Sequence, residues 1–213
     1  QTYCNQVTSY IRSLIRKGTL EIGAPVKEAV LSEQLGISRA PIREALQVLV
    51  QEGLITSEPQ KGKHVRQMTG KEIYDSYVVA GILEGAGVAE SLPLWTEANM
   101  ETFRSVVRQM EGKISYATKL DELAEIDELF HATLFMACDN TRLVEMARTS
   151  CATISKYLYY QHWITMFTPR EYADRHHAVA EAVYSRDVKH VETALRDHYK
   201  ETGLRMAQFG KEA

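Results

Sequence analysis

The stretch from Leu31 to Leu46, LSEQLGISRAPIREAL, constrains the fold more than any other part of this sequence. Gly36 interrupts a helical pattern where the chain must reverse, and glycine tolerates the positive φ that such a reversal needs. Ser38 is placed to act as an N-cap, and Pro41 falls in the first turn of the following helix, where its missing N–H costs nothing. The pattern therefore predicts two helices joined by a tight turn.

The second of these helices has two unlike faces when its residues are spaced at 100°. One arc is apolar and consists of Ile42, Ala45, Leu46 and Leu49. The exposed helix start and the opposite arc lead with positive charge and comprise Ser38, Arg39, Ala40, Arg43, Glu44, Gln47 and Gln51. This is the form of a helix-turn-helix recognition helix, which packs on one side and enters DNA on the other. The alternative is a merely solvated face, because Glu33 and Glu44 lie close to the arginines in sequence.

The neighbouring sequence completes a winged helix. An amphipathic helix is predicted over residues 2–17, and another over 27–35. Strands are predicted at 54–58 and 63–66, joined by the turn PQKG. Lys61 and Lys63 flank Gly62, so the wing tip can approach a DNA backbone closely.

Charge and periodicity divide the chain into two modules. The whole chain has net charge −3, but residues 1–66 hold nine Lys and Arg against six Asp and Glu. A basic module joined to an acidic one is expected when only the first contacts phosphate. We therefore expect a DNA-binding domain at 1–68 and an all-helical bundle at 69–213, giving a mainly α fold. The bundle's predicted helices are 71–92, 97–116, 119–138, 141–164, 169–186 and 188–208, with a capping box at Thr168–Glu171.

Several features favour a cytoplasmic protein with no membrane partner. No apolar run is expected to approach the roughly 20 residues that span a bilayer. The N-terminal residues QTYCNQ have neither the basic segment nor the apolar core of a signal peptide. The three cysteines are far apart and show no paired spacing, which suggests a reducing compartment.

Four polar residues fall on the predicted buried faces of the helical module. Asp127 and His131 are four residues apart and share a face with leucines. His176 is in phase with valines of its helix, and His198 with Val191 and Leu195 in the last helix. Three imidazoles and one carboxylate suit a divalent transition metal inside a helical bundle. Buried histidines satisfied by hydrogen bonds alone are the alternative.

The other histidines are expected to be surface or structural: His64, His162, His177 and His190. An aromatic group near the middle of the helical module is expected to form core or a subunit interface, with a ligand pocket as the alternative. Its members are Tyr157, Tyr159, Tyr160, His162 and Trp163.

The run LSEQLGISRAPIREALQVLVQEGLI, followed by PQKG and KHV, closely resembles the winged helix of GntR-type bacterial transcription regulators. The remainder resembles the FadR-type C-terminal domain of that family. The matching elements there are Leu83-Glu84, Asp127-x-x-Phe130-His131, Asn140-x-x-Leu143 and His176…Asp187…His198.

The resemblance implies DNA contacts from Arg39, Arg43 and the wing tip Lys61-Gly62. It also implies that Asp127, His131, His176 and His198 hold zinc, nickel or manganese near a small effector. Two positions depart from the family pattern. Ala80 stands where many relatives carry an arginine, which puts a clamped carboxylate effector in question. Ala29 replaces a basic residue that some members use on DNA.

We expect a homodimeric transcription regulator, a repressor and not an enzyme, that binds a palindromic operator and responds to a small effector. Organic or sugar acids are the expected effector class. Two other readings remain: a metal-dependent enzyme using the bundle site, and a regulator whose signal is the metal itself.

Overall fold

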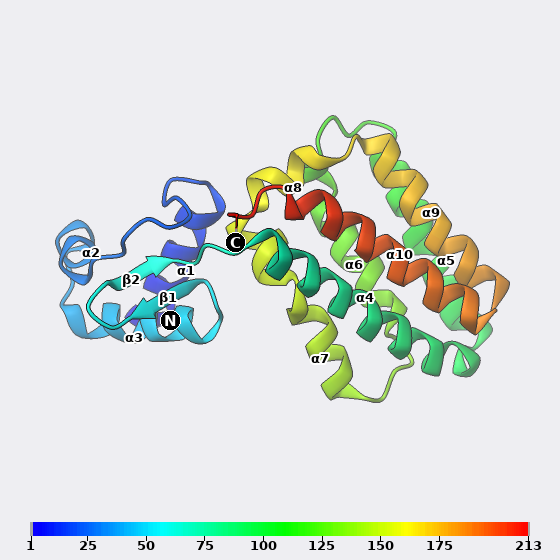
Figure 1. Ribbon diagram of the computed structural model, residues 1–213. Coiled ribbons are helices and arrows are strands. Elements are labelled where there is room, and N and C mark those ends of the chain that lie inside the picture. The colour runs from blue at the N-terminus through cyan, green and yellow to red at the C-terminus, as the bar shows by residue number, and fades with distance from the viewer. Residues whose placement is uncertain (1, 213) are drawn as a thin grey trace. The chain divides into compact units, whose positions relative to one another are not determined.

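The computed structural model describes residues 2–212 and shows a largely helical chain in two compact units (Figure 1). The first unit contains the chain up to Thr69, the segment Ala152–Gln161 and the stretch from Gly210 onward. The second contains Gly70–Cys151 and His162–Phe209. The mainly α fold with a small two-stranded sheet is as predicted.

The first unit is a winged helix. Its elements are α1 (Tyr3–Arg16), α2 (Glu28–Leu35), α3 (Arg39–Gln51), β1 (Ile55–Glu58) and β2 (Gly62–Val65). Gly36 ends α2 with φ 64°, as its position predicted. Ser38 occupies the N-cap of α3, but its side chain makes no capping hydrogen bond. The four apolar residues predicted to face inward from α3 are fully buried.

The wing is an antiparallel pair whose register runs from Ile55 opposite Val65 to Glu58 opposite Gly62. Gln60 at φ 66° and Gly62 at φ 84° form the tip of the turn. The chain before α2 runs along the outer side of β2, where the Val26 N–H donates to the Lys63 carbonyl at 2.8 Å. The wing is therefore tied to the segment that leads into α2.

The single helix predicted at 141–164 is wrong. The chain instead forms α7 (Thr141–Ser150), a π-helical turn labelled η3 (Ile154–Leu158) and α8 (Tyr160–Met166). The interrupting residues pack into the first unit, where the Tyr159 hydroxyl donates to the Met68 carbonyl at 3.3 Å and accepts from its N–H at 3.1 Å. Tertiary contacts override the helical periodicity here, and the interruption takes the form of a single π-helical turn, the usual form of π-helix in proteins.

Helices make up the second unit. They are α4 (Gly70–Ser91), η1 (Leu92–Leu94), α5 (Glu97–Ile114), η2 (Leu120–Leu123), α6 (Ala124–Leu134), α9 (Pro169–Ser185) and α10 (Val188–Ala207), together with α7 and α8. The helix predicted at 119–138 is shorter than expected, because its start is a 3₁₀ turn and its α-helical part ends at Leu134. The core lies between α5, α6, α9 and α10, around Phe103 and Phe130.

Helices α4 and α10 lie side by side, at a separation that glycines allow (Figure 1). A Cβ at Gly81 would lie 2.8 Å from the Cβ of Tyr199, and one at Gly203 would lie 2.8 Å from the Cβ of Tyr77. Each tyrosine therefore sits over a glycine of the facing helix. The stretch Gly70–Leu94 is long and apolar enough to span a membrane, but half of it is buried inside the protein, as in a core helix.

Candidate metal centre and DNA-facing surface

Three helices bring three histidines together in the second unit. His131 comes from α6, His176 from α9 and His198 from α10, and one nitrogen of each lies within 4.8 Å of the others. Ring centroids are 4.8 Å apart for His176 and His198, and 5.3 Å apart for His131 and His198. The three inward helical phases inferred from the sequence meet at this one point.

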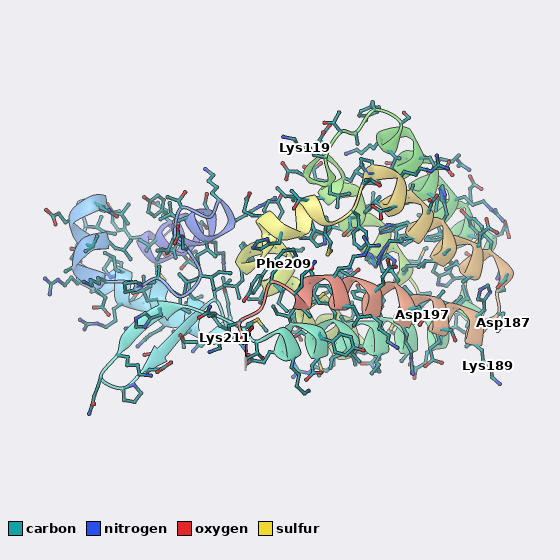
Figure 2. The ribbon with its side chains drawn as sticks, turned by 45° about the horizontal axis from the view of Figure 1, so that its top comes forward. Lys119, Asp187, Lys189, Asp197, Phe209 and Lys211 are labelled. Carbon is teal, nitrogen blue, oxygen red and sulfur yellow. The ribbon has the colours of Figure 1, made fainter. Side chains whose placement is uncertain are left out.

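Capping residues fix where two of these helices begin. The Thr168–Glu171 capping box begins α9 as predicted, with the Thr168 hydroxyl accepting from the Glu171 N–H at 3.2 Å. Asp187 caps α10 by accepting the Lys189 and His190 N–H groups, and Figure 2 shows Asp187 at the start of that helix and Phe209 just past its end. Both caps satisfy amide groups that a helix start otherwise leaves unpaired.

Glu84 of α4 and Tyr199 of α10 fix the orientation of His131. The Glu84 Oε1 lies 2.6 Å from His131 Nδ1, and the Tyr199 hydroxyl donates to Glu84 Oε2 at 2.7 Å. Glu84 is only 3% exposed. Because a carboxylate accepts, Nδ1 carries the proton of that contact. A neutral His131 then has its lone pair on Nε2, as in carboxylate–histidine–metal sites.

His176 is held between two acceptors. Its Nδ1 lies 2.8 Å from the Tyr172 carbonyl oxygen, and its Nε2 lies 3.1 Å from Asp127 Oδ1. A neutral imidazole has one N–H and can satisfy only one of these oxygens. A cation bound at Nε2 and Asp127 leaves Nδ1 free to donate to the carbonyl, so that every group has a partner.

His198 gives the second sign that the cluster suits a cation. Its Nδ1 is buried and has no hydrogen-bond partner among the described residues. An unpaired buried nitrogen is costly unless something binds it. Together with Nε2 of His131 and of His176 and the Asp127 carboxylate, it completes a donor set of the kind that divalent zinc takes in proteins. The residues therefore fit a metal ion.

The electrostatics separate the three imidazoles. Burial alone would lower the pKa of His131, but the charge of Glu84 and its hydrogen bond outweigh burial and raise that pKa to about 9. Burial lowers the pKa of His176 and, helped by nearby cationic groups, places that of His198 well below its ordinary value. Burial would raise the pKa of Asp127, but its hydrogen bond with His176 and the nearby His131 lower it.

The interpretation of the sequence missed Glu84. Glu84 was considered only as part of the motif Leu83-Glu84 and was given no place beside the histidines, where the structure puts it. The signal was the phase of α4, because Glu84 follows Ile73, Tyr77 and Ala80 at helical spacing and all four side chains are buried. Position 80 holds a fully buried alanine, and because alanine is uncharged it supplies no positive charge to the cluster.

The remaining histidines lie outside the cluster. His177 is half exposed beside Glu111, and His190 is exposed at the start of α10. His162 is exposed and stacks on Phe209 at 4.0 Å between ring centroids. His64 lies in the wing strand β2. Of the aromatic group, Tyr159 and Tyr160 are buried in the first unit, as expected of core residues.

The residues predicted to face DNA lie on the outer side of the winged helix. Those exposed are Ser38, Arg39, Ala40, Arg43, Gln47, Lys61 and Gly62, whereas Lys63 is partly buried. Their charges are not all free. Lys61 pairs with Glu58 at 2.7 Å, and both Arg43 and Lys63 pair with Glu28. Within the described residues no carboxylate pairs with Arg39.

Comparison with known proteins matches both units. Residues 4–65 match the family model "Bacterial regulatory proteins, gntR family", and residues 75–201 match the FCD domain. The chain is 26% identical over 193 residues to the HTH-type transcriptional repressor RspR of Escherichia coli, covering 89% of this chain and 82% of that protein.

Two further relatives are informative. A probable D-xylose utilization operon transcriptional repressor of Paenarthrobacter nicotinovorans is 31% identical over 146 residues, covering 67% of this chain and 62% of that protein. The structure of McbR/YncC of E. coli has the same fold, with a TM-score of 0.71 at 19% identity over 98% of this chain and 99% of that one. RspR and the Paenarthrobacter protein are named as transcriptional repressors, and the matching family model is one of regulatory proteins, not of enzymes. The chain therefore belongs to the GntR family of bacterial transcription regulators, with a GntR winged helix followed by an FCD domain.

Proposed function

We propose that this protein is a homodimeric transcriptional repressor whose operator affinity is set by a small acidic effector bound beside a divalent metal. The observation that carries the proposal is the convergence of three histidine nitrogens and the Asp127 carboxylate. Two features of this group are incompletely satisfied. The single N–H of a neutral His176 ring faces two acceptors, and the buried Nδ1 of His198 has no hydrogen-bond partner among the described residues. Asp127, His131, His176 and His198 would hold the ion, with zinc favoured over nickel or manganese by the imidazole-rich set.

A bound divalent ion would supply a Lewis-acidic position for an effector oxygen. The chain's own residues set its surroundings. Glu84 and Tyr199 orient His131, and Ala80 contributes no cation. Positive charge near the cluster instead comes from Arg175, whose side chain is 11% exposed. Its Nη2 donates to the His198 carbonyl at 2.6 Å, and its Nη1 pairs with Glu201 at 3.0 Å. An organic or sugar acid suits this combination.

The DNA side of the proposal rests on the winged helix. Arg39 and Arg43 lie on the exposed face of α3, and dimeric helix-turn-helix proteins read two half-sites of a palindrome. Repression is proposed because relatives such as RspR are named repressors. The effector can change operator affinity only as far as it prefers one arrangement of the dimer over the other. A cytoplasmic location follows from this role.

A chelation and ligand-screening experiment tests the proposal. Protein purified without a histidine tag is analysed for metal, and its Tm is then followed with small carboxylates and sugar acids, before and after chelation. At a ligand concentration 100 times Kd, the stabilisation is about 2.7 kcal/mol, or roughly 5–10 °C for a chain of this size. We expect this shift to vanish on chelation and in His176→Ala, but to persist in the exposed control His190→Ala.

Each rival has its own outcome in this experiment. If the purified protein contains no metal and its ligand-induced Tm shift survives chelation, the four residues form a metal-free, hydrogen-bonded cluster. Operator affinity that follows the metal alone would make the metal the signal. Turnover of a screened acid by the metal-loaded protein would contradict the regulatory assignment of the site.

A further inference from the structure

Glu28 lies where the recognition helix, the wing and α2 meet. It is the first residue of α2, and its side chain is 22% exposed. Its Oε2 accepts from both Nε and Nη2 of Arg43 at 3.2 Å, and its Oε1 accepts from Nζ of Lys63 at 3.2 Å. One carboxylate therefore binds two of the cations that the sequence assigns to DNA.

These contacts fix the orientation of the Arg43 guanidinium. A guanidinium is planar and carries five N–H donors, and Glu28 occupies the side formed by Nε and Nη2. The end formed by Nη1 and the second N–H of Nη2 is left for other acceptors, and the Arg43 side chain is 61% exposed. Two parallel donors on a held arginine match the O6 and N7 acceptors of guanine in the major groove.

The same contacts reduce the charge offered to phosphate. Glu28 stays ionised at neutral pH: burial would raise the pKa of its carboxyl, but the hydrogen bonds from Lys63 and Arg43 lower it. Its position in the first turn of α2 also favours negative charge. Lys63, with 23% of its side chain exposed, is thereby directed to Glu28 and away from a DNA backbone. Sequence-independent affinity comes from such cations, so Glu28 weakens it.

We propose that Glu28 is a specificity-determining residue: it holds Arg43 for a guanine edge and withholds Arg43 and Lys63 from phosphates. Glu28 acts through these two side chains and is a positioning residue. The proposal rests on DNA reading by α3. It is independent of the metal and the effector.

Glu28→Gln tests the proposal, with Glu33→Gln as the matched control. Both substitutions remove one negative charge from α2, and Glu33 is exposed. The probes are a duplex selected by the wild-type full-length protein from a random pool, and a scrambled duplex of the same length and composition. Fluorescence anisotropy gives both affinities between 50 and 200 mM salt.

We expect Glu28→Gln to bind the scrambled duplex more tightly and with a salt slope steeper by about one to two, since one or two cations are released to phosphate. The ratio of selected to scrambled affinity should fall about tenfold, as for loss of one good base contact. Glu33→Gln should change both affinities slightly and by the same factor. In an Arg43→Ala background, Glu28→Gln should no longer lower the ratio, because no guanidinium remains to be oriented.

Three outcomes would overturn the proposal. If Glu28→Gln and Glu33→Gln behave identically, Glu28 acts only through its negative charge and not by orienting Arg43. Equal weakening of both duplexes with a lower Tm would make its role structural. A wild-type protein that does not distinguish the duplexes would refute the recognition assignment itself, whereas discrimination that survives Glu28→Gln refutes Glu28 alone.

Discussion

Replacing Glu84 by Gln should change how metal affinity depends on pH. In the metal-free protein, Glu84 raises the pKa of His131 to about 9, so at pH 7 His131 carries a proton that a metal must displace. Because this pKa lies about two units above pH 7, displacing the proton weakens metal binding by about 2.7 kcal/mol at pH 7. His176 and His198, whose pKa values are lowered, are already neutral and add no proton to the balance above pH 7.

In the proposed metal site, the same carboxylate would also strengthen metal binding once the proton is gone. The 2.6 Å contact of Glu84 with His131 Nδ1 is charge-assisted, and a neutral amide in its place loses about 1–1.5 kcal/mol. That corresponds to roughly tenfold in affinity, within the range seen for groups that support a metal ligand. The two effects oppose each other at pH 7 and separate at higher pH.

We therefore expect wild-type metal affinity to rise by about tenfold per pH unit between pH 7 and 9, and to level off above it. Glu84→Gln should be nearly independent of pH over that range and about tenfold weaker than wild type at pH 9. Competition titrations against a metal-buffering chelator measure this, with Glu90→Gln, an exposed glutamate of α4, as control. Parallel pH profiles for wild type and Glu84→Gln would refute the assigned role of Glu84.

The raised pKa of His131 has a consequence for the stability of chelated protein. A group whose pKa is raised by folding stabilises the fold below its unfolded pKa of about 6.5, and that stabilisation is lost as pH rises toward 9. The buried neutral His176 and His198 act in the opposite sense and destabilise the fold below about pH 6.5. Chemical denaturation of chelated protein should show greatest stability near pH 6.5–7, with a flatter alkaline side in Glu84→Gln. A monotonic rise to pH 9 would contradict this account.

Three more changes test single features of the structure. Gly81→Ala should lower the free energy of unfolding by about 1–3 kcal/mol and weaken metal binding, because the added Cβ meets Tyr199. The control Gly112→Ala, with open space around the new Cβ, should raise the free energy of unfolding by about 0.5–1 kcal/mol. Equal effects of the two substitutions in chemical denaturation would refute the close-packing argument. Tyr159→Phe should lower the free energy of unfolding by about 1 kcal/mol, because it removes the hydrogen bonds of the hydroxyl with the N–H and the carbonyl of Met68. An unchanged denaturation midpoint would contradict this. Arg39→Ala should reduce the salt slope of DNA binding by about one, and an unchanged affinity and slope would remove Arg39 from the DNA surface.

Local and periodic features were readable from the sequence. Gly36 marked the end of α2 because its backbone takes positive φ, and the Thr168 capping box marked the start of α9. The inward phase of His131, His176 and His198 followed from 3.6-residue periodicity, which depends on each helix alone. The basic character of residues 1–66 within a chain of net charge −3 was equally visible in composition.

Only the tertiary structure decided which of these side chains meet. Periodicity gives the face on which a residue lies but not the partner helix or the distance across it, so Glu84 became part of the histidine cluster only when α4 packed against α10 through Gly81. The segment Ala152–Gln161 is helical by pattern, yet its contacts with the first unit break it into a π-helical turn. The pairing of Glu28 with Arg43 and Lys63 likewise joins residues 15 and 35 positions apart, an interaction that no local pattern encodes.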